Sequence, residues 1–195
     1  MHSAFMTYWF VLLVVTGGCA EVADLTTGQA IAIGVYDYTH LAKPVLAEAQ
    51  SETTSIFGRF GVHLIWVHCL DRGSVSPCRP LLSPGFITLN LVSRSMGSKI
   101  AMNDKRLGVT IERTIYILYQ PIEETIGAKD PERGQILARI IAHELGHVLL
   151  PPKAHSDKGI MRPSWRLRDL QNEISFTSDQ EKQIRVSVVG LTAQH

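Results

Sequence analysis

The chain has 195 residues and carries 19 Lys and Arg against 18 Asp and Glu, which gives a formal net charge of +1 at pH 7. A balance this even gives no sign of the basic footprint that binds nucleic acid, so we expect no nucleic-acid partner. If a leader of about 20 residues is removed, roughly 175 residues remain, enough for one domain with a sizeable core but not for two. We therefore predict a single domain over residues 21–195.

The N-terminus is predicted to direct export. Residues 5–15 form an apolar run that has the length of a signal-peptide core and is too short to span a membrane comfortably. Small residues follow at Gly18, Cys19 and Ala20, so we predict a signal peptide over residues 1–20 that is cleaved after Ala20. The alternative is a lipoprotein with its lipid on Cys19. In both cases we expect a secreted or periplasmic protein.

Alternating strand and helix patterns follow the leader. The segments whose apolar and β-branched residues predict strands are 30–36, 62–67, 86–92 and 114–119, with a short edge strand at 107–111. Between the first two strands, residues 41–59 place apolar side chains near helical spacing and predict a long helix. The domain is therefore predicted to open with a βαβ unit.

Two cysteines remain if Cys19 leaves with the signal peptide or carries lipid. Cys69 and Cys78 enclose a short loop, and in an exported protein such a pair predicts a disulfide. Closing a loop of about ten residues stabilises a protein by roughly 2–3 kcal/mol in a chain-entropy treatment. The alternative is two free thiols. A metal site built on the pair is not expected, since no further cysteine is there to complete it.

A buried helix is predicted over residues 131–150. Asp130 can cap it, and Pro131 suits the first helical position. Ile136 and Ile140 then begin an apolar line at helical spacing. The same spacing continues into a pair of histidines, so the helix is expected to combine an apolar face with a polar, functional stripe.

The functional stripe consists of His143, Glu144 and His147. The two histidines are four residues apart, so they project from one face at the separation that lets two imidazoles share a tetrahedral metal. Glu144 lies about 100° around the same turn, where its carboxylate can take a proton from water without becoming a ligand. This pattern predicts a zinc hydrolase with Glu144 as general base. The alternative is a core helix whose histidines are only hydrogen-bonded, which would bury costly polar groups.

A catalytic zinc takes three protein ligands and keeps one open position, so a further donor must follow the helix. Pro151 and Pro152 lack backbone donors, and Pro151 also disfavours helical dihedrals at Leu150, so the helix must end there. The turn that follows would bring His155 back to the metal, and we predict His155 as the third ligand. The alternative third ligand is a later acid such as Glu173.

The stretch from His143 to Met161 resembles the metzincin superfamily of zinc metallopeptidases. The superfamily pattern is HExxHxxGxxH followed by a turn with an invariant Met, and this chain has HELGHVLLPPKAHSDKGIM. The third His stands eight residues after the second rather than six, and Leu150 occupies the position of the Gly. The whole arrangement also resembles small secreted bacterial metallopeptidase-like proteins, in which a His-Ser-x-x-Gly-Ile-Met-Arg segment like the one that begins at His155 recurs.

The resemblance implies an α+β fold, a mixed α/β sandwich with a twisted mixed sheet, a long helix, an active-site helix, a Met turn and a C-terminal helix. Residues 177–181 carry overlapping capping boxes that predict the start of this last helix. The resemblance also implies one catalytic Zn²⁺ on His143, His147 and His155, and hydrolysis of a peptide or protein substrate. Met161 would form a packing floor beneath the ligands, without a chemical role.

Residues Arg162, Pro163 and Trp165 directly follow the Met turn and could line a substrate pocket. We expect a monomer whose only membrane contact is export or a lipid anchor at Cys19. Three functions remain open: an exported zinc endopeptidase, a module of the same fold that binds zinc or peptide without efficient turnover, and a gluzincin-like peptidase with a Glu as third ligand.

Overall fold

The computed structural model describes residues 30–69, 78, 85–100, 102, 106–127, 131–165, 169 and 174–192. The predicted signal peptide, Cys19 and the alternative ligand Glu173 lie outside these residues. No helix within the described ranges is both long and apolar enough to cross a membrane.

Five strands form one mixed sheet in the order β2-β1-β3-β5-β4. They are β1 (Ala30–Asp37), β2 (His63–His68), β3 (Ile87–Val92), β4 (Gly108–Ile111) and β5 (Thr114–Leu118). β1 pairs in parallel with β2 and β3, β3 pairs in parallel with β5, and β4 runs antiparallel to β5. The five predicted strands are confirmed, and β4 is an edge strand as expected.

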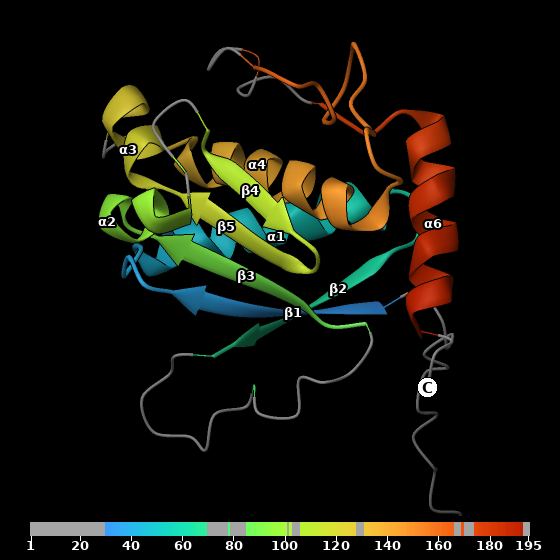
Figure 1. Cartoon of the computed structure of the whole chain (residues 1–195), viewed down its shortest axis with the longest axis horizontal. Helices are drawn as coiled ribbons and strands as arrows, with labels where there is room; N and C mark the ends of the chain where they lie inside the picture. The colour runs from blue at the N-terminus through green and yellow to red at the C-terminus, as the bar shows by residue number, and fades with distance from the viewer. Residues whose placement is uncertain are drawn as a thin grey trace, which may run out of the picture.

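The helices of the described residues are α1 (Lys43–Gly58), α2 (Arg94–Gly97), α3 (Gln120–Ile126), α4 (Arg133–Leu149) and α6 (Ser178–Thr192), with a short 3-10 helix at Ser98–Ile100. α1 and α4 pack together on one face of the sheet (Figure 1). α6 stands at one end of the sheet, and α2 and α3 lie at the other (Figure 1). This arrangement of helices on a mixed sheet agrees with the predicted α+β class.

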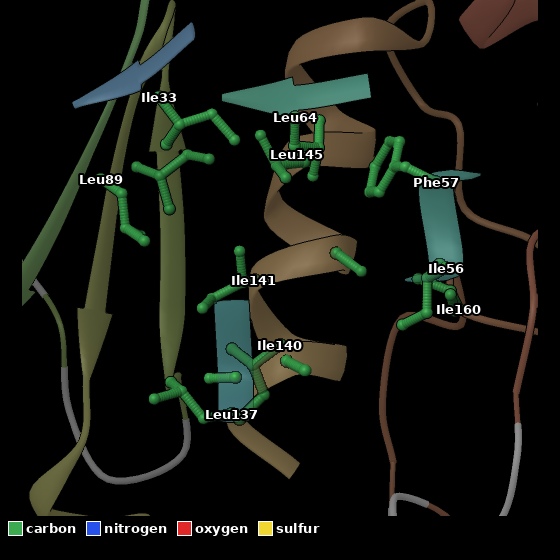
Figure 2. Packing of buried hydrophobic residues seen from close by; sticks show 14 of the residues in the cluster. Ile33, Ile56, Phe57, Leu64, Leu89, Leu137, Ile140, Ile141, Leu145 and Ile160 are labelled. Carbon is green, nitrogen blue, oxygen red and sulfur yellow. The ribbon is translucent and has the colours of Figure 1, made fainter. Parts of the chain in front are cut away.

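The core lies between the sheet and the helices α1 and α4. Ile33 and Leu89 extend from the strands toward α4, which presents Leu137, Ile141 and Leu145 at a spacing of four residues (Figure 2). All five side chains are fully buried. Burial of one such side chain contributes about 1.5–3 kcal/mol. The apolar stripe therefore fixes α4 on the sheet, and the remaining residues of the helix are positioned with it.

α6 begins with the predicted capping box. The backbone N–H of Gln180 donates to Oγ1 of Thr177 (3.3 Å), and Oε1 of Gln180 accepts from the backbone N–H of Thr177 (3.0 Å). These reciprocal bonds satisfy two backbone donors that a helix start otherwise leaves unpaired. The start of α6 predicted from the sequence is thus confirmed.

The predicted start of α4 is wrong by two residues. Pro131 lies in a turn, and the helix begins at Arg133 with Glu132 as its N-cap. The physical reason is the bonding pattern, since the N–H of Ile136 donates to the carbonyl of Glu132 (2.9 Å) and helical bonding starts from there. Asp130, the predicted cap, lies outside the described residues.

Cys69 and Cys78 are joined in a disulfide, with their Cα atoms 5.4 Å apart. Cys69 directly follows β2, and its N–H donates to the carbonyl of Val35 in β1 (2.9 Å). The disulfide therefore attaches Cys78 to the end of the β1–β2 pair.

Candidate metal centre

Two histidines of α4 face each other on one side of the helix. Nε2 of His143 lies 3.0 Å from Nε2 of His147. The rings are nearly perpendicular, with centroids 4.7 Å apart. Both side chains are half-buried. The four-residue spacing produces this arrangement, because side chains four positions apart share a helix face.

The backbone orients the ring of His143. Its Nδ1 lies 2.8 Å from the carbonyl oxygen of Ile160, and because a carbonyl can only accept, Nδ1 must carry the hydrogen. Burial lowers the pKa of His143 to about 4, so its imidazole is neutral near pH 7. The lone pair on Nε2 therefore faces His147, and a metal-binding imidazole needs this tautomer and orientation.

α4 ends where the proline pair predicts. Leu150 has φ −102° and ψ 159°, the extended conformation expected before a proline. Lys153 then adopts a left-handed conformation with φ 66°, and the chain turns back toward the helix. The turn places the ring centroid of His155 at 5.4 Å from that of His143 and 4.8 Å from that of His147. The structure thus brings the three predicted ligands together.

The three histidines could hold a metal ion, since their donor nitrogens all lie within 4.8 Å of one another. Nitrogens bound at 2.0–2.1 Å to one tetrahedral zinc are about 3.3 Å apart. The pair on α4, at 3.0 Å, is close to this separation. His155 would move inward by no more than about 1.5 Å to reach it, and because His155 is exposed on a loop, it has room to do so. Neutral imidazoles are good ligands for zinc and for other transition metals.

Met161 packs against the helix that carries the first two histidines. It is completely buried, and a Cβ at Gly146 would collide with the Met161 sulfur. Glycine at this position therefore lets the methionine approach the helix backbone next to His147. The carbonyl of Met161 also accepts a hydrogen bond from the N–H of Ser156 in the His155 loop (2.9 Å). Met161 thus contacts both the helix and the loop that carry the candidate ligands.

The carboxylate of Glu144 is buried beneath β4. Its Oε2 accepts a hydrogen bond from Oγ1 of Thr110 (2.7 Å). Gly108, on the same face of β4, makes room for it, because a Cβ there would collide with the carboxylate. Burial raises the pKa of Glu144 to about 7, although the bond from Thr110 and the charge of Arg106 act to lower it. Such a carboxyl group can accept and release a proton near neutral pH, as acid–base catalysis requires.

Of the three residues expected to line a substrate pocket, only Trp165 lies next to the candidate ligands. Its ring is edge-on to His143, with centroids 4.8 Å apart. Arg162 instead forms an ion pair with Asp169 (3.5 Å), and Pro163 is exposed. The structure therefore places one of the three next to the candidate ligands.

Several contributors to the site were not anticipated from the sequence. Thr110 and Gly108 come from β4, and the Ile160 carbonyl comes from the turn at residues 160–161. Gln180 was predicted only as part of a cap, yet it also contacts the His155 loop. No local pattern marks these residues, because each depends on how distant segments pack.

The chain matches none of the protein-family models, and no curated protein is detectably similar to it in sequence.

Proposed function

We propose that this chain is an exported, metzincin-like zinc endopeptidase that holds one Zn²⁺ through His143, His147 and His155. The observation that carries the proposal is the convergence of three imidazoles from a helix and a loop, with the buried Glu144 directly after His143 on the same helix. Three nitrogen ligands with an open fourth position are typical of catalytic zinc, whereas structural zinc sites are closed by a fourth protein ligand.

The chemistry follows from the neighbouring groups. A zinc ion at this site would act as a Lewis acid that polarises the scissile carbonyl and makes water more acidic. Glu144 would accept the proton of the attacking water and return it to the leaving amine; burial raises the pKa of this carboxyl group, to about 7 in the metal-free protein, which favours its taking up a proton.

The position of β4 supports an extended peptide as the substrate. β4 is an edge strand whose neighbour in the sheet is β5. The exposed edge of a sheet can pair with an extended peptide through backbone hydrogen bonds. Because Thr110 of β4 bonds to Glu144, a peptide added at this edge would pass close to the proposed general base.

The order of elements and the disulfide support the remaining parts of the proposal. Strands with a long helix precede α4, and the Met turn and α6 follow it, which is the order of elements in metzincin catalytic domains. A disulfide such as Cys69–Cys78 is typical of exported proteins, so we include a secreted or periplasmic location.

Substitution of Glu144 by Gln tests the catalytic role. Gln keeps the shape of the side chain but cannot accept the proton, so hydrolysis of any peptide that the wild type cleaves should fall by about 10²–10⁴-fold. Zinc content and fold should be retained. Turnover is measured on a peptide library at matched zinc occupancy, with metal analysis of each sample. Glu52→Gln, on α1, is the matched control and should leave turnover unchanged.

Two outcomes would contradict the proposal. If Glu144→Gln keeps more than about a tenth of wild-type turnover, Glu144 is not the general base. If the wild type binds zinc but cleaves nothing in the library, the chain is better described as a zinc- or peptide-binding module. The observation that favours this second function is the spread of the donor nitrogens, up to 4.8 Å, which is wider than a bound ion allows.

A further inference from the structure

One buried side chain ties the loop that carries His155 to the last helix. Gln180, in the first turn of α6, is 8% exposed. Its Nε2 donates to the carbonyl oxygen of Ala154 (3.2 Å) and to Oγ of Ser156 (3.1 Å). These are the residues on either side of His155. A single amide therefore holds both flanks of the predicted third ligand, through the backbone carbonyl of Ala154 and the side-chain hydroxyl of Ser156.

The orientation of the Gln180 amide is fixed by its partners. Oε1 accepts from the backbone N–H of Thr177 (3.0 Å), and Nε2 donates to the loop. Because the Thr177 N–H can only donate and the Ala154 carbonyl can only accept, turning the amide around would lose both bonds. Ser156 extends the series, since its Oγ donates to the carbonyl of Lys158 (2.7 Å). The loop and the start of α6 thus share one set of hydrogen bonds.

The loop backbone matters because the ring of His155 is held less directly than that of His143. The Ile160 carbonyl orients the ring of His143. Among the residues that the structure describes, no such bond is made to the ring of His155, and this side chain is exposed. The direction of its imidazole therefore follows from the backbone between Ala154 and Ser156.

We propose that Gln180 is a positioning residue for the third metal ligand, because its amide holds residues 154–156 so that His155 faces the two histidines of α4. This role rests on the zinc site proposed above, and it goes beyond capping of α6. Groups that orient metal ligands from outside the coordination shell typically change metal affinity by about 10–100-fold when they are removed.

Four variants separate this role from capping. Gln180→Glu can still accept from the Thr177 N–H, as Glu does in a capping box, but it has no hydrogen to donate to Ala154. Gln180→Leu removes both functions. Thr177→Val removes the Oγ1 cap and leaves the Gln180 amide intact. Gln183→Leu changes an exposed glutamine of the same helix and serves as the matched control.

The experiment uses the full chain and two measurements. Zinc affinity is measured by competition with a chromophoric chelator, and hydrogen exchange of residues 153–161 is measured in the metal-free protein. We expect Gln180→Glu and Gln180→Leu to weaken zinc binding by about 10–100-fold and to speed exchange in this segment, including the Ser156 amide that bonds to Met161. Thr177→Val and Gln183→Leu should change zinc affinity by less than about threefold, whatever they do to stability.

The outcomes distinguish this inference from the proposed function. If the wild type binds zinc and Gln180→Glu binds it equally well, with unchanged exchange in residues 153–161, the role of Gln180 is overturned and the zinc site stands. If Thr177→Val weakens zinc binding as much as Gln180→Glu does, Gln180 acts only through the cap, and the inference is again overturned. A wild type without affinity for zinc overturns the proposed function together with the inference.

Discussion

Two of the three predicted ligands, His143 and His147, lie on α4, whereas His155 lies on an exposed loop. α4 is held by several fully buried apolar side chains, each worth about 1.5–3 kcal/mol. The loop is held by hydrogen bonds such as those from Gln180, each worth a net 0.5–1.5 kcal/mol or so, and by the packing of Met161. The half of the candidate site on α4, the helix half, is therefore fixed by the hydrophobic core. The half that carries His155, the loop half, is fixed by a few polar contacts and the packing of Met161.

The loop half is tested most directly by His155→Ala. We expect zinc affinity to fall by more than the roughly 10–100-fold typical of a lost outer partner, because a ligand itself is removed. α4 should keep its structure, which circular dichroism can check. The measurement is a chelator competition, with His63→Ala, an exposed histidine of β2, as control. If His155→Ala binds zinc with unchanged affinity, another residue, for instance Glu173, is the third ligand, and the His155 loop is not part of the site.

In the helix half, the burial of Glu144 should make the free energy of unfolding depend on pH. The pKa of Glu144 is raised by burial from 4.5 to about 7, so the folded metal-free protein holds this proton more tightly than the unfolded chain does. Stability should therefore be lost as the pH rises from about 4.5 to 7, by an amount on the order of 3 kcal/mol. Glu144→Gln cannot titrate and should not show this loss.

The measurement is the free energy of unfolding of both metal-free proteins in denaturant between pH 4 and pH 8. His143 acts in the opposite direction, because burial lowers its pKa to about 4 and stability is lost as the pH falls below 6.5. Both proteins share that loss, so it cancels in their difference. If the difference in unfolding free energy between the two proteins stays constant across this pH range, folding does not raise the pKa of Glu144.

The contact between the two halves is tested by Gly146→Ala. The new methyl group would collide with the sulfur of Met161, and overpacking of this kind typically costs about 1–3 kcal/mol. Gly190→Ala, in α6, is the matched control, since nothing lies within 4 Å of the added Cβ. There we expect a gain of about 0.5–1 kcal/mol from the helix propensity of Ala.

A double-mutant cycle with Met161→Ala separates the clash from other effects. Met161→Ala should be destabilising alone because it leaves a cavity. The double variant should be less destabilised than the sum of the two single variants, because shortening Met161 removes the collision. Strict additivity of the unfolding free energies would mean that Gly146 and Met161 do not meet, and the two halves would then be independent.

Elements with a strong local pattern could be predicted from the sequence. The strands, α1 and α4 follow from apolar periodicity, and the start of α6 follows from the Thr177–Gln180 capping box. The short helices α2 and α3 were missed, because four and seven residues are too few to show a helical period. Ser93 caps α2 through a bond from Met96, and Pro121 lies in the first turn of α3, so weak signals for both were present.

In the candidate site, too, contacts set by a local pattern could be predicted and long-range contacts could not. The spacing of His143 and His147 predicts their juxtaposition, because both lie on one rigid helix. The contact between Thr110 and Glu144 spans 34 residues of sequence, and that between Gln180 and Ala154 spans 26. These contacts depend on the order of the strands and on the docking of α6, and neither is encoded in a local pattern.

The connection from His147 to His155 is two residues longer than the spacing in the metzincin pattern, and the two prolines account for its length. Two extra flexible residues would raise the entropic cost of closing this loop by only about 0.3 kcal/mol. Ordering their backbones would add roughly 1–2 kcal/mol each. In Pro151 and Pro152 the ring already fixes φ in the unfolded chain, so much of that second cost does not arise. The longer loop therefore brings His155 to the candidate metal site with part of its conformational freedom already removed.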